Sequence, residues 1–420
     1  MNRPKVAVVG AGAAGMTAAI FAARGGADVV LLDASARPGT KILISGGGRC
    51  NVLPGEYRAN AFYSSGSANV LKRLFKTWPH ADVRSFFEDQ LGVPLMLEEE
   101  SGKLFPKANR AKVVHEALLL ALEEEGVELR KSWKVERIST SEPAETTDLH
   151  NTPTDCYTVH GPHGQQLQAD RVILAAGGRS VPKTGSDGSG YQLAQELGHD
   201  LTPLYPALVP LTAKDGWWTE LAGLATEVQW SAMDGQKRRA QGNGNLLFTH
   251  FGFSGPAALD ASHWYAREQC TIRVAWNSYS EQDWQKHIWG GNNQRLASLL
   301  QQRLPKRLAS ALLQHCGLDH DQNPAQMNKQ KRRELLTALS AFELPLAGTR
   351  GYDYAEVTGG GVALAEVNPS TLQSRRRPGL FFCGEIMDVI GDIGGHNFLW
   401  AWVTGKLAGS QAARDLGPRS

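Results

Sequence analysis

The order of apolar and polar positions predicts a strand, a turn, a helix and a second strand at the start of the chain. Residues 5–9 form a short apolar run, glycines follow at once, and residues 16–26 carry apolar side chains at helical spacing. A second apolar run over residues 27–32 ends in Asp33. Short apolar runs that border glycines are typical of buried parallel strands, so this region predicts a βαβ unit.

Later segments predict one α/β domain that is built from both ends of the chain. Residues 83–126 read as mostly helical, interrupted by a hairpin over 93–106, and residues 127–169 alternate like an antiparallel meander. A buried strand ending in glycines follows, and the chain closes with another strand and a helix. The predicted α/β domain therefore takes residues 1–198 and 346–420, and 199–345 form an insert, β-rich over 199–276 and helical over 292–345. A polar loop over 140–155 is expected to be a tolerated insertion.

Composition narrows the class of protein. The chain has 420 residues and a formal net charge of +2, so no electrostatic argument favours nucleic acid or an acidic membrane as a partner. Five scattered cysteines without a C-x-x-C pair argue against a zinc site and for a reducing compartment. No apolar run is long enough to span a bilayer, and little chain precedes Lys5 to hold a leader. We expect a cytoplasmic protein without a metal.

The first turn carries the G-x-G-x-x-G spacing. In "GAGAAG", Gly10 suits the tight turn after the strand, Gly12 lets the backbone approach a pyrophosphate, and Gly15 lets helix pack on strand. The pyrophosphate would lie at the helix N-terminus, where free N–H groups and the helix dipole favour an anion. Asp33, at the end of the second strand, can accept the ribose hydroxyls of an adenosine. The segment predicts a dinucleotide site.

The end of the chain favours a flavin over a nicotinamide as that dinucleotide. In "GLFFCGEIMDVIGDIGGHN" a strand delivers Gly384 and Glu385, and a helix begins near Gly394 to Asn397. Such a helix N-terminus can point its positive end at the pyrimidine edge of a flavin, which becomes anionic on reduction. Glu385 would reach the ribityl chain or a ribose.

A third glycine-rich stretch, "KILISGGGRCNVLPG" over residues 41–55, allows three interpretations. A phosphate-binding P-loop is excluded because no Lys-Ser/Thr follows the glycines at the required offset. A nucleophilic role for Cys50 is disfavoured because no paired base is specified. The remaining interpretation is a backbone that passes close to the cofactor, which glycine permits because it lacks a side chain.

Taken in order along the chain, these motifs resemble the BaiN/YhiN-type (RdsA-related) FAD-dependent oxidoreductases, which include aminoacetone-oxidase-like members. The matching pieces include "VAVVGAGAAGMTAA", "GTKILISGGGRCNV", "ILAAGGRSVPKTGSDGSGYQLAQELGH", "GTRGYDYAEVTGGGVAL" and "GLFFCGEIMDVIGDIGGHN". The resemblance implies an α/β fold with a two-segment Rossmann-like FAD-binding domain of the fumarate-reductase-like kind and an inserted β-rich plus helical domain. It also implies FAD held non-covalently.

The resemblance assigns cofactor-binding residues position by position. The ADP half is assigned to Gly10, Gly12, Ala14, Gly15 and Asp33, and the adenine to the backbone of Val135 in a strand "SWKVERI". The segment behind the cofactor is Ala176, Gly177 and Gly178. The ribityl and ring region takes Lys41, Gly47, Gly48, Arg49, Cys50 and Asn51, and the ring end is closed by Glu385, Asp388, Asn397 and Phe398.

No catalytic residue is specified by the sequence. His396, which stands where the family commonly has an aromatic residue, His250 and Arg350 are weak candidates beside the flavin. The expected reaction is hydride transfer between flavin N5 and a small organic substrate, with NAD(P)H as an optional transient donor because no second G-x-G-x-x-G follows a strand. The alternatives are an oxidase that passes electrons from a small amine to O₂, and a non-catalytic flavin- or RNA-binding protein that uses the basic helix around Lys329 to Arg333.

Overall fold

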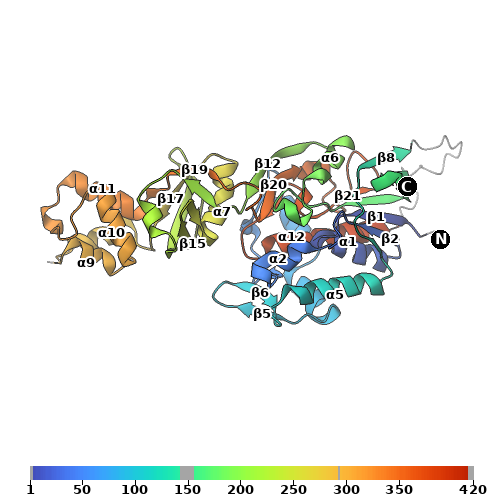
Figure 1. The fold of residues 1–420 in the computed structure, drawn as a ribbon, viewed down its shortest axis with the longest axis horizontal. Helices are drawn as coiled ribbons and strands as arrows, with labels where there is room; N and C mark the ends of the chain where they lie inside the picture. Colours follow the sequence, from blue (N-terminus) through green and yellow to red (C-terminus); the bar gives the residue numbers. More distant parts are fainter. Residues whose placement is uncertain (1–2, 142–155, 292–293, 415–420) are drawn as a thin grey trace. The chain divides into compact units, whose positions relative to one another are not determined.

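A computed structural model describes residues 3–141, 156–291 and 294–414, so nearly all of the expected polar loop lies outside the described residues. The chain divides into two compact units (Figure 1). The first unit combines Met1–Leu204 with Val357–Ser420, and the second is Tyr205–Glu356. Each unit has its own buried apolar core.

A five-stranded parallel sheet forms the centre of the first unit. Its order is β21 (Leu380–Phe382), β11 (Arg171–Leu174), β1 (Lys5–Val9), β2 (Asp28–Leu32) and β7 (Glu128–Arg130). β1 pairs with β11 on one side and with β2 on the other, and its residues from Val6 to Val9 are buried. The strand is apolar throughout because both faces of a parallel sheet are covered. Turns at the carboxyl ends of these strands carry the predicted motifs.

The first and last described helices pack closely against one another. α1 spans Ala13–Arg24 and α12 spans His396–Ala413, and Figure 1 shows them side by side. A Cβ atom at Gly405 would lie 2.5 Å from the Ala14 carbonyl oxygen, and one at Gly409 would lie 2.1 Å from that of Ala18. Only glycine permits this approach, so these two positions fix α12 against α1.

Smaller elements surround this sheet. They are α2 (Thr40–Gly48), β3 (Leu53–Pro54), β4 (Phe62–Tyr63), α3 (Ala68–Lys76), α4 (His80–Ser85), β5 (Leu95–Glu98), β6 (Lys103–Pro106), α5 (Ala111–Glu124), β8 (Arg137–Ser141), β9 (Cys156–His160), β10 (Gln166–Ala169), α6 (Ser189–Glu196), β12 (Leu201–Ala207), β20 (Val357–Val362) and β22 (Ile390–Gly391). The hairpin of β5 and β6 lies at the position expected from the sequence.

Two details of the expected meander need correction. Its first strand, β7, joins the parallel sheet beside β2, and only β8, β9 and β10 form an antiparallel sheet. Val135 was expected within a strand but precedes β8, which begins at Arg137. Both differences come from non-local strand pairing, which apolar periodicity does not report.

The second unit is a seven-stranded sheet with helices. The sheet order is β18 (Phe342–Glu343), β17 (Thr271–Ala275), β14 (Ala225–Asp234), β15 (Lys237–Thr249), β16 (Gly252–Ser254), β13 (Leu211–Ala213) and β19 (Leu346–Thr349). The helices are α7 (Gly255–Ala266), α8 (Glu281–Trp289), α9 (Leu296–Gln301), α10 (Lys306–His315) and α11 (Lys329–Ser340). Trp276, at the end of β17, is buried and donates its indole hydrogen bond to the Ala338 carbonyl of α11 at 2.8 Å.

The second unit begins at Tyr205 and ends at Glu356, whereas the sequence predicted an insert over residues 199–345. β19 pairs with β13, so the residues just after 345 belong to the second unit. β12 begins in the first unit, where the Thr202 hydroxyl accepts from Gly361 N–H at 3.0 Å and lies 3.2 Å from the Gly361 carbonyl. Backbone pairing between segments far apart in sequence therefore sets both junctions.

Candidate functional site

The turn between β1 and α1 has the geometry that its glycines predict. Gly10 has φ +99°, and a Cβ there would lie 2.6 Å from the Ala175 carbonyl oxygen. A Cβ at Gly15 would lie 1.8 Å from the Gly10 carbonyl oxygen. A Cβ at Gly12 would meet nothing within 4 Å, and α1 begins after Gly12 without a side-chain cap. Gly10 and Gly15 are required for packing, while the space at Gly12 is open above an uncapped helix N-terminus.

Asp33 is held against this turn by the backbone. One carboxylate oxygen accepts from Ala11 N–H at 2.7 Å and the other from Ser35 N–H at 2.8 Å. Burial raises the pKa of the Asp33 carboxyl, and the two N–H groups act in the opposite direction. Each oxygen retains a lone pair, so the carboxylate can still accept hydroxyl groups. The structure thus brings Asp33 and the Gly-rich turn together.

A polar network joins α2 to the segment after β21. The Lys41 ammonium lies 2.9 Å from Glu385 Oε2 and 2.6 Å from Ser180 Oγ. Glu385 Oε1 accepts from Ser180 Oγ and from Thr358 N–H, both at 2.9 Å. Four segments that are distant in sequence therefore converge on one carboxylate. Lys41 and Glu385 were predicted in this region, whereas Ser180 was not.

The glycine-containing segment that follows β11 packs against this network. A Cβ at Gly178 would come within 2.4 Å of Thr358 Oγ1 and 2.5 Å of Glu385 Oε1, so only glycine fits. Gly177 has φ +74°, and a Cβ there would have only contacts of 3.4 Å or more. Ala176 packs against Gly190 of α6. This backbone is open on the side of Gly177 and closed on the side of Gly178.

The third glycine stretch forms a left-handed turn at the end of α2. Gly46, Gly47 and Gly48 have φ of +56°, +69° and +84°. A Cβ at Gly46 would lie 3.0 Å from the Phe105 ring, whereas Gly47 has nothing within 4 Å and Gly48 has only a contact at 3.9 Å. Since positive φ favours glycine, the run is required by backbone conformation, and its last two members face open space.

The residues that follow this turn have protein partners of their own. Arg49 lies 2.8 Å from Glu98 and stacks 4.0 Å above the Phe105 ring centroid. Cys50 is buried with φ +62°, and burial raises the pKa of its thiol to about 12. The Asn51 amide, with its oxygen toward α12, bridges the Gly395 N–H and the Leu53 carbonyl. The Cys50 side chain thus belongs to the core, and a thiolate nucleophile is disfavoured.

The residues predicted to close the ring end of the cofactor site form hydrogen bonds or ring contacts with other residues of the first unit. Asp388 is buried and accepts from the Ser65 N–H and hydroxyl. The Asn397 amide pairs with both main-chain groups of Gly391 at 2.8 Å. Phe398 stacks on Trp402 with ring centroids 5.4 Å apart. These contacts shape the loop that precedes α12, whose N-terminus carries no side-chain cap.

His396, the first residue of α12, is a buried histidine rather than an exposed base. It packs edge-on against Phe62, with ring centroids 5.5 Å apart, and burial lowers its pKa to about 4. Asp392, four residues earlier, was not among the candidates predicted from the sequence. Burial raises the pKa of its carboxyl to about 6. Tyr63 and Arg58 act on that carboxyl in the opposite direction. Opposite pKa shifts in neighbouring groups are typical of sites where protons are transferred.

Three further candidates form no hydrogen bond, ion pair or ring contact with the residues described above. His250 and Arg350 belong to the second unit, where Arg350 stacks on Tyr354 and Phe251. Their place beside the flavin stays a prediction. Val135 lies in the first unit, and among the described residues neither of its main-chain polar groups bonds to another backbone group.

Several features expected of a dinucleotide site belong to the first unit. The backbone leaves space at Gly12, Gly47 and Gly177. The Asp33 and Glu385 carboxylates are held by hydrogen bonds, and the N-terminus of α12 has no side-chain cap. Within the described ranges no cluster of three His, Cys, Asp or Glu is arranged to hold a metal ion. Over the same residues, no helix combines the length and the apolar character needed to cross a bilayer.

Comparison with known proteins agrees with this geometry. A 3-dehydro-bile acid delta(4,6)-reductase of Clostridium scindens is 32% identical over 433 residues, covering 98% of this chain and 99% of that protein. A ribosomal RNA dihydrouridine synthase of Escherichia coli is 34% identical over 411 residues, covering 96% of each chain. The crystal structure of a 3-ketosteroid delta1-dehydrogenase from Sterolibacterium denitrificans has a TM-score of 0.51 and 14% identity, covering 98% of this chain and 100% of that one.

Similarity at 14% identity supports the fold alone, and the family rests on the sequence matches. Residues 4–411 match the family described as HI0933-like protein Rossmann domain. That match covers both segments of the first unit and the whole second unit. The chain therefore belongs to the HI0933-like Rossmann-domain family.

Proposed function

We propose that this protein exchanges a hydride between non-covalently held FAD and a small organic substrate, with NAD(P)H as the electron donor. Bound FAD supplies a ring position that accepts and donates hydride, and the protein supplies orientation and electrostatics. The observation that carries the proposal is the Glu385 network, because it fixes a carboxylate between Lys41 of α2 and Ser180 of the segment after β11, both of which belong to motifs expected along the cofactor.

The residues of the first unit have separate tasks in holding the cofactor. The N-terminus of α1 at Gly12 would bind the pyrophosphate, and Asp33 would accept ribose hydroxyls. Glu385 Oε1 already accepts from Ser180 and Thr358, whereas Oε2 faces Lys41 and keeps a lone pair that can accept a ribityl hydroxyl. The uncapped N-terminus of α12 would place partial positive charge at the pyrimidine edge.

Proton transfer near the ring end has two candidate groups with opposite properties. His396 stays neutral at pH 7 because burial lowers its pKa to about 4, so it is a poor general acid. Asp392 titrates closer to neutrality because burial raises its pKa to about 6. We therefore assign any local proton-linked step to Asp392 in preference to His396.

Anaerobic mixing tests the proposed reaction. The yellow holoprotein is combined with NADH or NADPH, and the flavin absorbance is followed until it bleaches, after which enone, hydroxy-steroid or amine substrates are added. Bleaching by the dinucleotide followed by recovery with a substrate supports the proposal. Bleaching by an amine, with stoichiometric peroxide in air, would instead identify the oxidase alternative. A purified protein that is colourless and takes up no FAD would contradict both.

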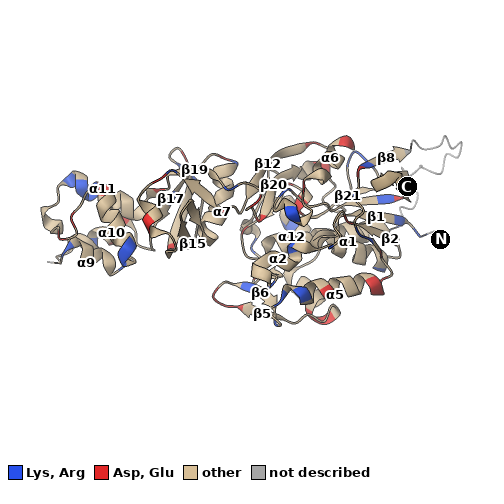
Figure 2. Cartoon of the chain, viewed as in Figure 1, with Lys and Arg blue, Asp and Glu red and all other residues tan. Residues whose placement is uncertain are grey.

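Reduction of a base in RNA is a second candidate function. Two relatives, from Escherichia coli and Haemophilus influenzae, carry the name ribosomal RNA dihydrouridine synthase. Between residues 281 and 340, Lys and Arg outnumber Asp and Glu, and Figure 2 shows basic segments on α11 and beside α10. Lys329 and Arg333 are exposed at the start of α11. Such residues favour phosphate contacts.

Binding of a ribosomal RNA fragment at several salt concentrations tests this second candidate. Replacement of Lys329 and Arg333 by glutamine should weaken binding and reduce its salt dependence. Replacement of both Lys107 and Lys112 by glutamine, at exposed positions outside the second unit, provides a control of equal charge change. Equal affinity of all three proteins for the fragment would refute this surface as the RNA contact.

A further inference from the structure

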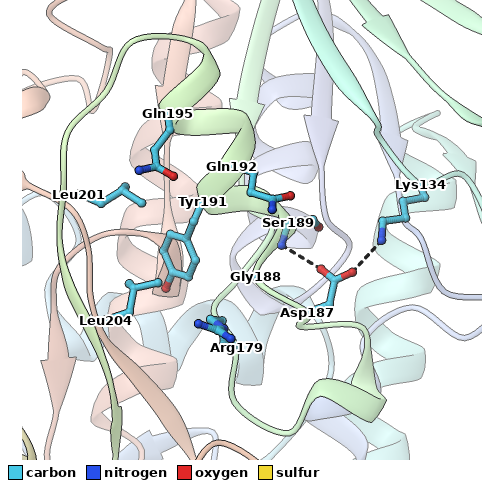
Figure 3. Close-up of a pocket in the computed structure, with 10 residues that line it drawn as sticks. All are labelled: Lys134, Arg179, Asp187, Gly188, Ser189, Tyr191, Gln192, Gln195, Leu201 and Leu204. Atoms are coloured by element: carbon cyan, nitrogen blue, oxygen red, sulfur yellow. Dashed lines mark hydrogen bonds and ion pairs between the residues drawn. The ribbon is translucent and has the colours of Figure 1, made fainter.

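The pocket shown in Figure 3 adjoins the cofactor segments and offers no independent site. Its volume is about 510 Å³. Two of its lining residues, Lys134 and Arg179, are sequence neighbours of residues predicted to hold the cofactor. The dashed lines in Figure 3 mark the partners of Asp187, which lies 2.8 Å from the Lys134 ammonium. The charge of Lys134 is therefore offset within the pocket.

Lys103, on β6, is a cation of the first unit without such a partner. Its side chain is partly buried, and across the described residues its ammonium has neither a hydrogen bond nor an ion pair. Glu98 lies opposite it in the β5–β6 ladder, but that carboxylate pairs with Arg49 at 2.8 Å. Hydrogen bonds from Ser101 and Arg49 are the main causes that hold the pKa of Glu98 below its ordinary value, and attraction to Lys103 is the smallest. The charge of Lys103 is therefore left for a ligand.

The side chain of Lys103 reaches the turn that begins α12. A Cβ at Gly394 would lie 3.8 Å from Lys103 Cε. β3 contacts both the strand and the helix: Pro54 pairs with Lys103, and a Cβ at Gly395 would lie 2.5 Å from the carbonyl carbon of Leu53. Backbone contacts of β3 on both sides thus fix the position of Lys103 relative to the N-terminus of α12.

The same face of β6 contacts the glycine turn of α2. Phe105 lies two residues after Lys103, so both side chains point to one face of the strand. A Cβ at Gly46 would lie 3.0 Å from the Phe105 ring, and the Arg49 guanidinium stacks 4.0 Å above the ring centroid. Asn51, just after that turn, accepts from the backbone N–H at the N-cap of α12. One strand face therefore touches both segments that the family resemblance assigns to the flavin ring.

The other charged groups at this end of the unit do not offset Lys103. Burial raises the pKa of Asp392 to about 6, and attraction to Arg58 acts in the opposite direction, so these two groups attract one another. His396 is neutral at pH 7, because burial lowers its pKa to about 4. Lys103 thus adds a positive charge at the beginning of α12.

A cation at this place has a specific use in flavin chemistry. A hydride brings two electrons and one proton, so a reduced flavin carries one negative charge unless it takes up a second proton. That charge lies over the pyrimidine edge of the ring. A helix N-terminus offers only about half an elementary charge, whereas an ammonium offers a whole one. An ammonium close to this edge therefore favours the reduced flavin over the oxidised one.

We propose that Lys103 is the cation that stabilises reduced FAD in its anionic form and so raises the reduction potential of the bound cofactor. The inference rests on the proposed function, which assigns the pyrimidine edge of FAD to the N-terminus of α12. Lys103 contributes little to the binding of oxidised FAD, because the oxidised ring is neutral. It acts on the reduced state through its charge.

Potentiometric titration of the FAD-loaded protein tests this role without a substrate or a nicotinamide. The flavin is reduced with dithionite against a dye of known potential in the wild type, Lys103→Met, Lys103→Arg and Lys107→Met. Lys107→Met is the matched control, because Lys107 is an exposed lysine just after β6. Fluorescence titration of the unloaded proteins gives the affinity for oxidised FAD, and thermal unfolding without FAD shows whether each variant is folded.

We expect Lys103→Met to reduce the affinity for reduced FAD relative to oxidised FAD by about tenfold. For a two-electron couple this change lowers the reduction potential by about 30 mV. Lys103→Arg keeps the charge and should stay within about twofold of the wild type, as should Lys107→Met. Equal potentials in Lys103→Met and the wild type would overturn the inference. An equal loss of affinity for both redox forms would also overturn it, since a purely structural role gives that result.

Proton uptake during reduction provides a second readout, obtained from the pH dependence of the potential. Anionic reduced FAD takes up one proton for each electron pair, and neutral reduced FAD takes up two. The pH at which the uptake falls from two protons to one should be higher in Lys103→Met than in the wild type, because the variant lacks the ammonium that favours the anion. The same pH in both proteins would contradict the assignment of Lys103 to the anionic form.

These measurements separate the inference from the proposed function. Bleaching of the wild-type flavin by NADH, with an unchanged potential in Lys103→Met, would refute the role of Lys103 and leave the donor in place. A lowered potential in Lys103→Met, with no bleaching of the wild type by NADH or NADPH, would refute NAD(P)H as the donor and leave the role of Lys103.

Discussion

Lys41 and Glu385 form an ion pair with 2.9 Å between Nζ and Oε2, although α2 and the segment after β21 lie at opposite ends of the sequence. Both side chains are partly buried, with exposed fractions of 27% and 19%. Partial burial limits screening by water, so the pair can fix the orientation of the carboxylate. The two halves of the flavin unit are thus joined at the residue proposed to bind the ribityl chain.

Replacement of Lys41 by methionine should weaken FAD binding several-fold. Glu385 would keep its hydrogen bonds from Ser180 and Thr358 but lose the cation that completes its orientation. Stability without FAD should fall by only about 1 kcal/mol, because partly exposed pairs contribute little. Fluorescence titration of the unloaded protein with FAD measures the affinity. Lys112→Met, at an exposed ion pair on α5, is the control. Equal affinity in both variants would refute the role of Lys41.

Gly12 and Gly15 should respond in opposite ways to alanine. Gly12→Ala places a methyl group where no protein atom lies within 4 Å, so the fold should persist while FAD binding weakens. Gly15→Ala places a methyl group 1.8 Å from the Gly10 carbonyl oxygen, so the fold itself should be damaged. Thermal unfolding without FAD and FAD titration distinguish the two results. Unchanged FAD affinity in a folded Gly12→Ala protein would mean that no ligand fills this space.

Asp33→Asn should weaken FAD binding by about ten- to hundredfold, because it removes a charged hydrogen-bond acceptor. An amide also satisfies only one of the two N–H groups, from Ala11 and Ser35, that the carboxylate accepts. Asp28→Asn, at the exposed other end of β2, is the matched control.

The pH dependence of FAD binding provides a second check of Asp33. Burial raises its pKa, so the affinity of the wild type should fall as the pH decreases through that raised value. The affinity of Asp33→Asn should not show this decrease. If the two proteins lose FAD in parallel as the pH falls, another group controls binding.

Stability should decrease as the pH falls below about 6.5, partly because of His396. Burial lowers its pKa in the folded protein to about 4, so the unfolded chain binds the proton first. The contribution of His396 to the free energy of unfolding is fully present above the pKa of histidine in the unfolded chain, 6.5. It is lost as the pH falls from 6.5 to about 4. It amounts to about 3 kcal/mol at most.

His396→Phe isolates that contribution. The substitution removes the titrating group and keeps an aromatic ring against Phe62. Urea unfolding at pH 7 and pH 5 should show a smaller loss of stability in the variant than in the wild type. His263, whose pKa burial lowers to about 3, remains in both proteins, so the wild-type slope should be reduced and not abolished. Identical slopes would show that His396 does not titrate as described.

The sequence predicts the parts of the site that depend on local spacing. Gly10 and Gly15 occupy tight contacts, and Asp33 accepts from Ala11, because a strand, a turn and a helix of this length place them together. The hairpin of β5 and β6 also follows from a local pattern, an apolar run that turns at Gly102. Such features involve neighbours in the chain.

The parts that the sequence does not predict depend on pairing between distant segments. Ser180 and Asp392 lie within segments that match the family, but the sequence assigned neither of them a role, and their contacts with Lys41 and Tyr63 come from distant parts of the chain. The sequence placed the residues of β19 in the flavin domain. In the structure β19 pairs with β13 of the second unit, and apolar periodicity does not reveal such pairing. The cofactor-binding roles carried by the family resemblance, including those of Arg49 and Cys50, stay predictions.

The contact of Gly405 and Gly409 with α1 has a consequence for biosynthesis. α1 leaves the ribosome early, but the surface against which it packs is encoded near the other end of the message. The insert of Tyr205–Glu356 emerges complete before α12 does, so it can fold while the flavin unit still lacks its last helix. Translation that stops before α12 would therefore release a folded insert beside an unfinished flavin unit. We expect cofactor loading to follow the synthesis of α12.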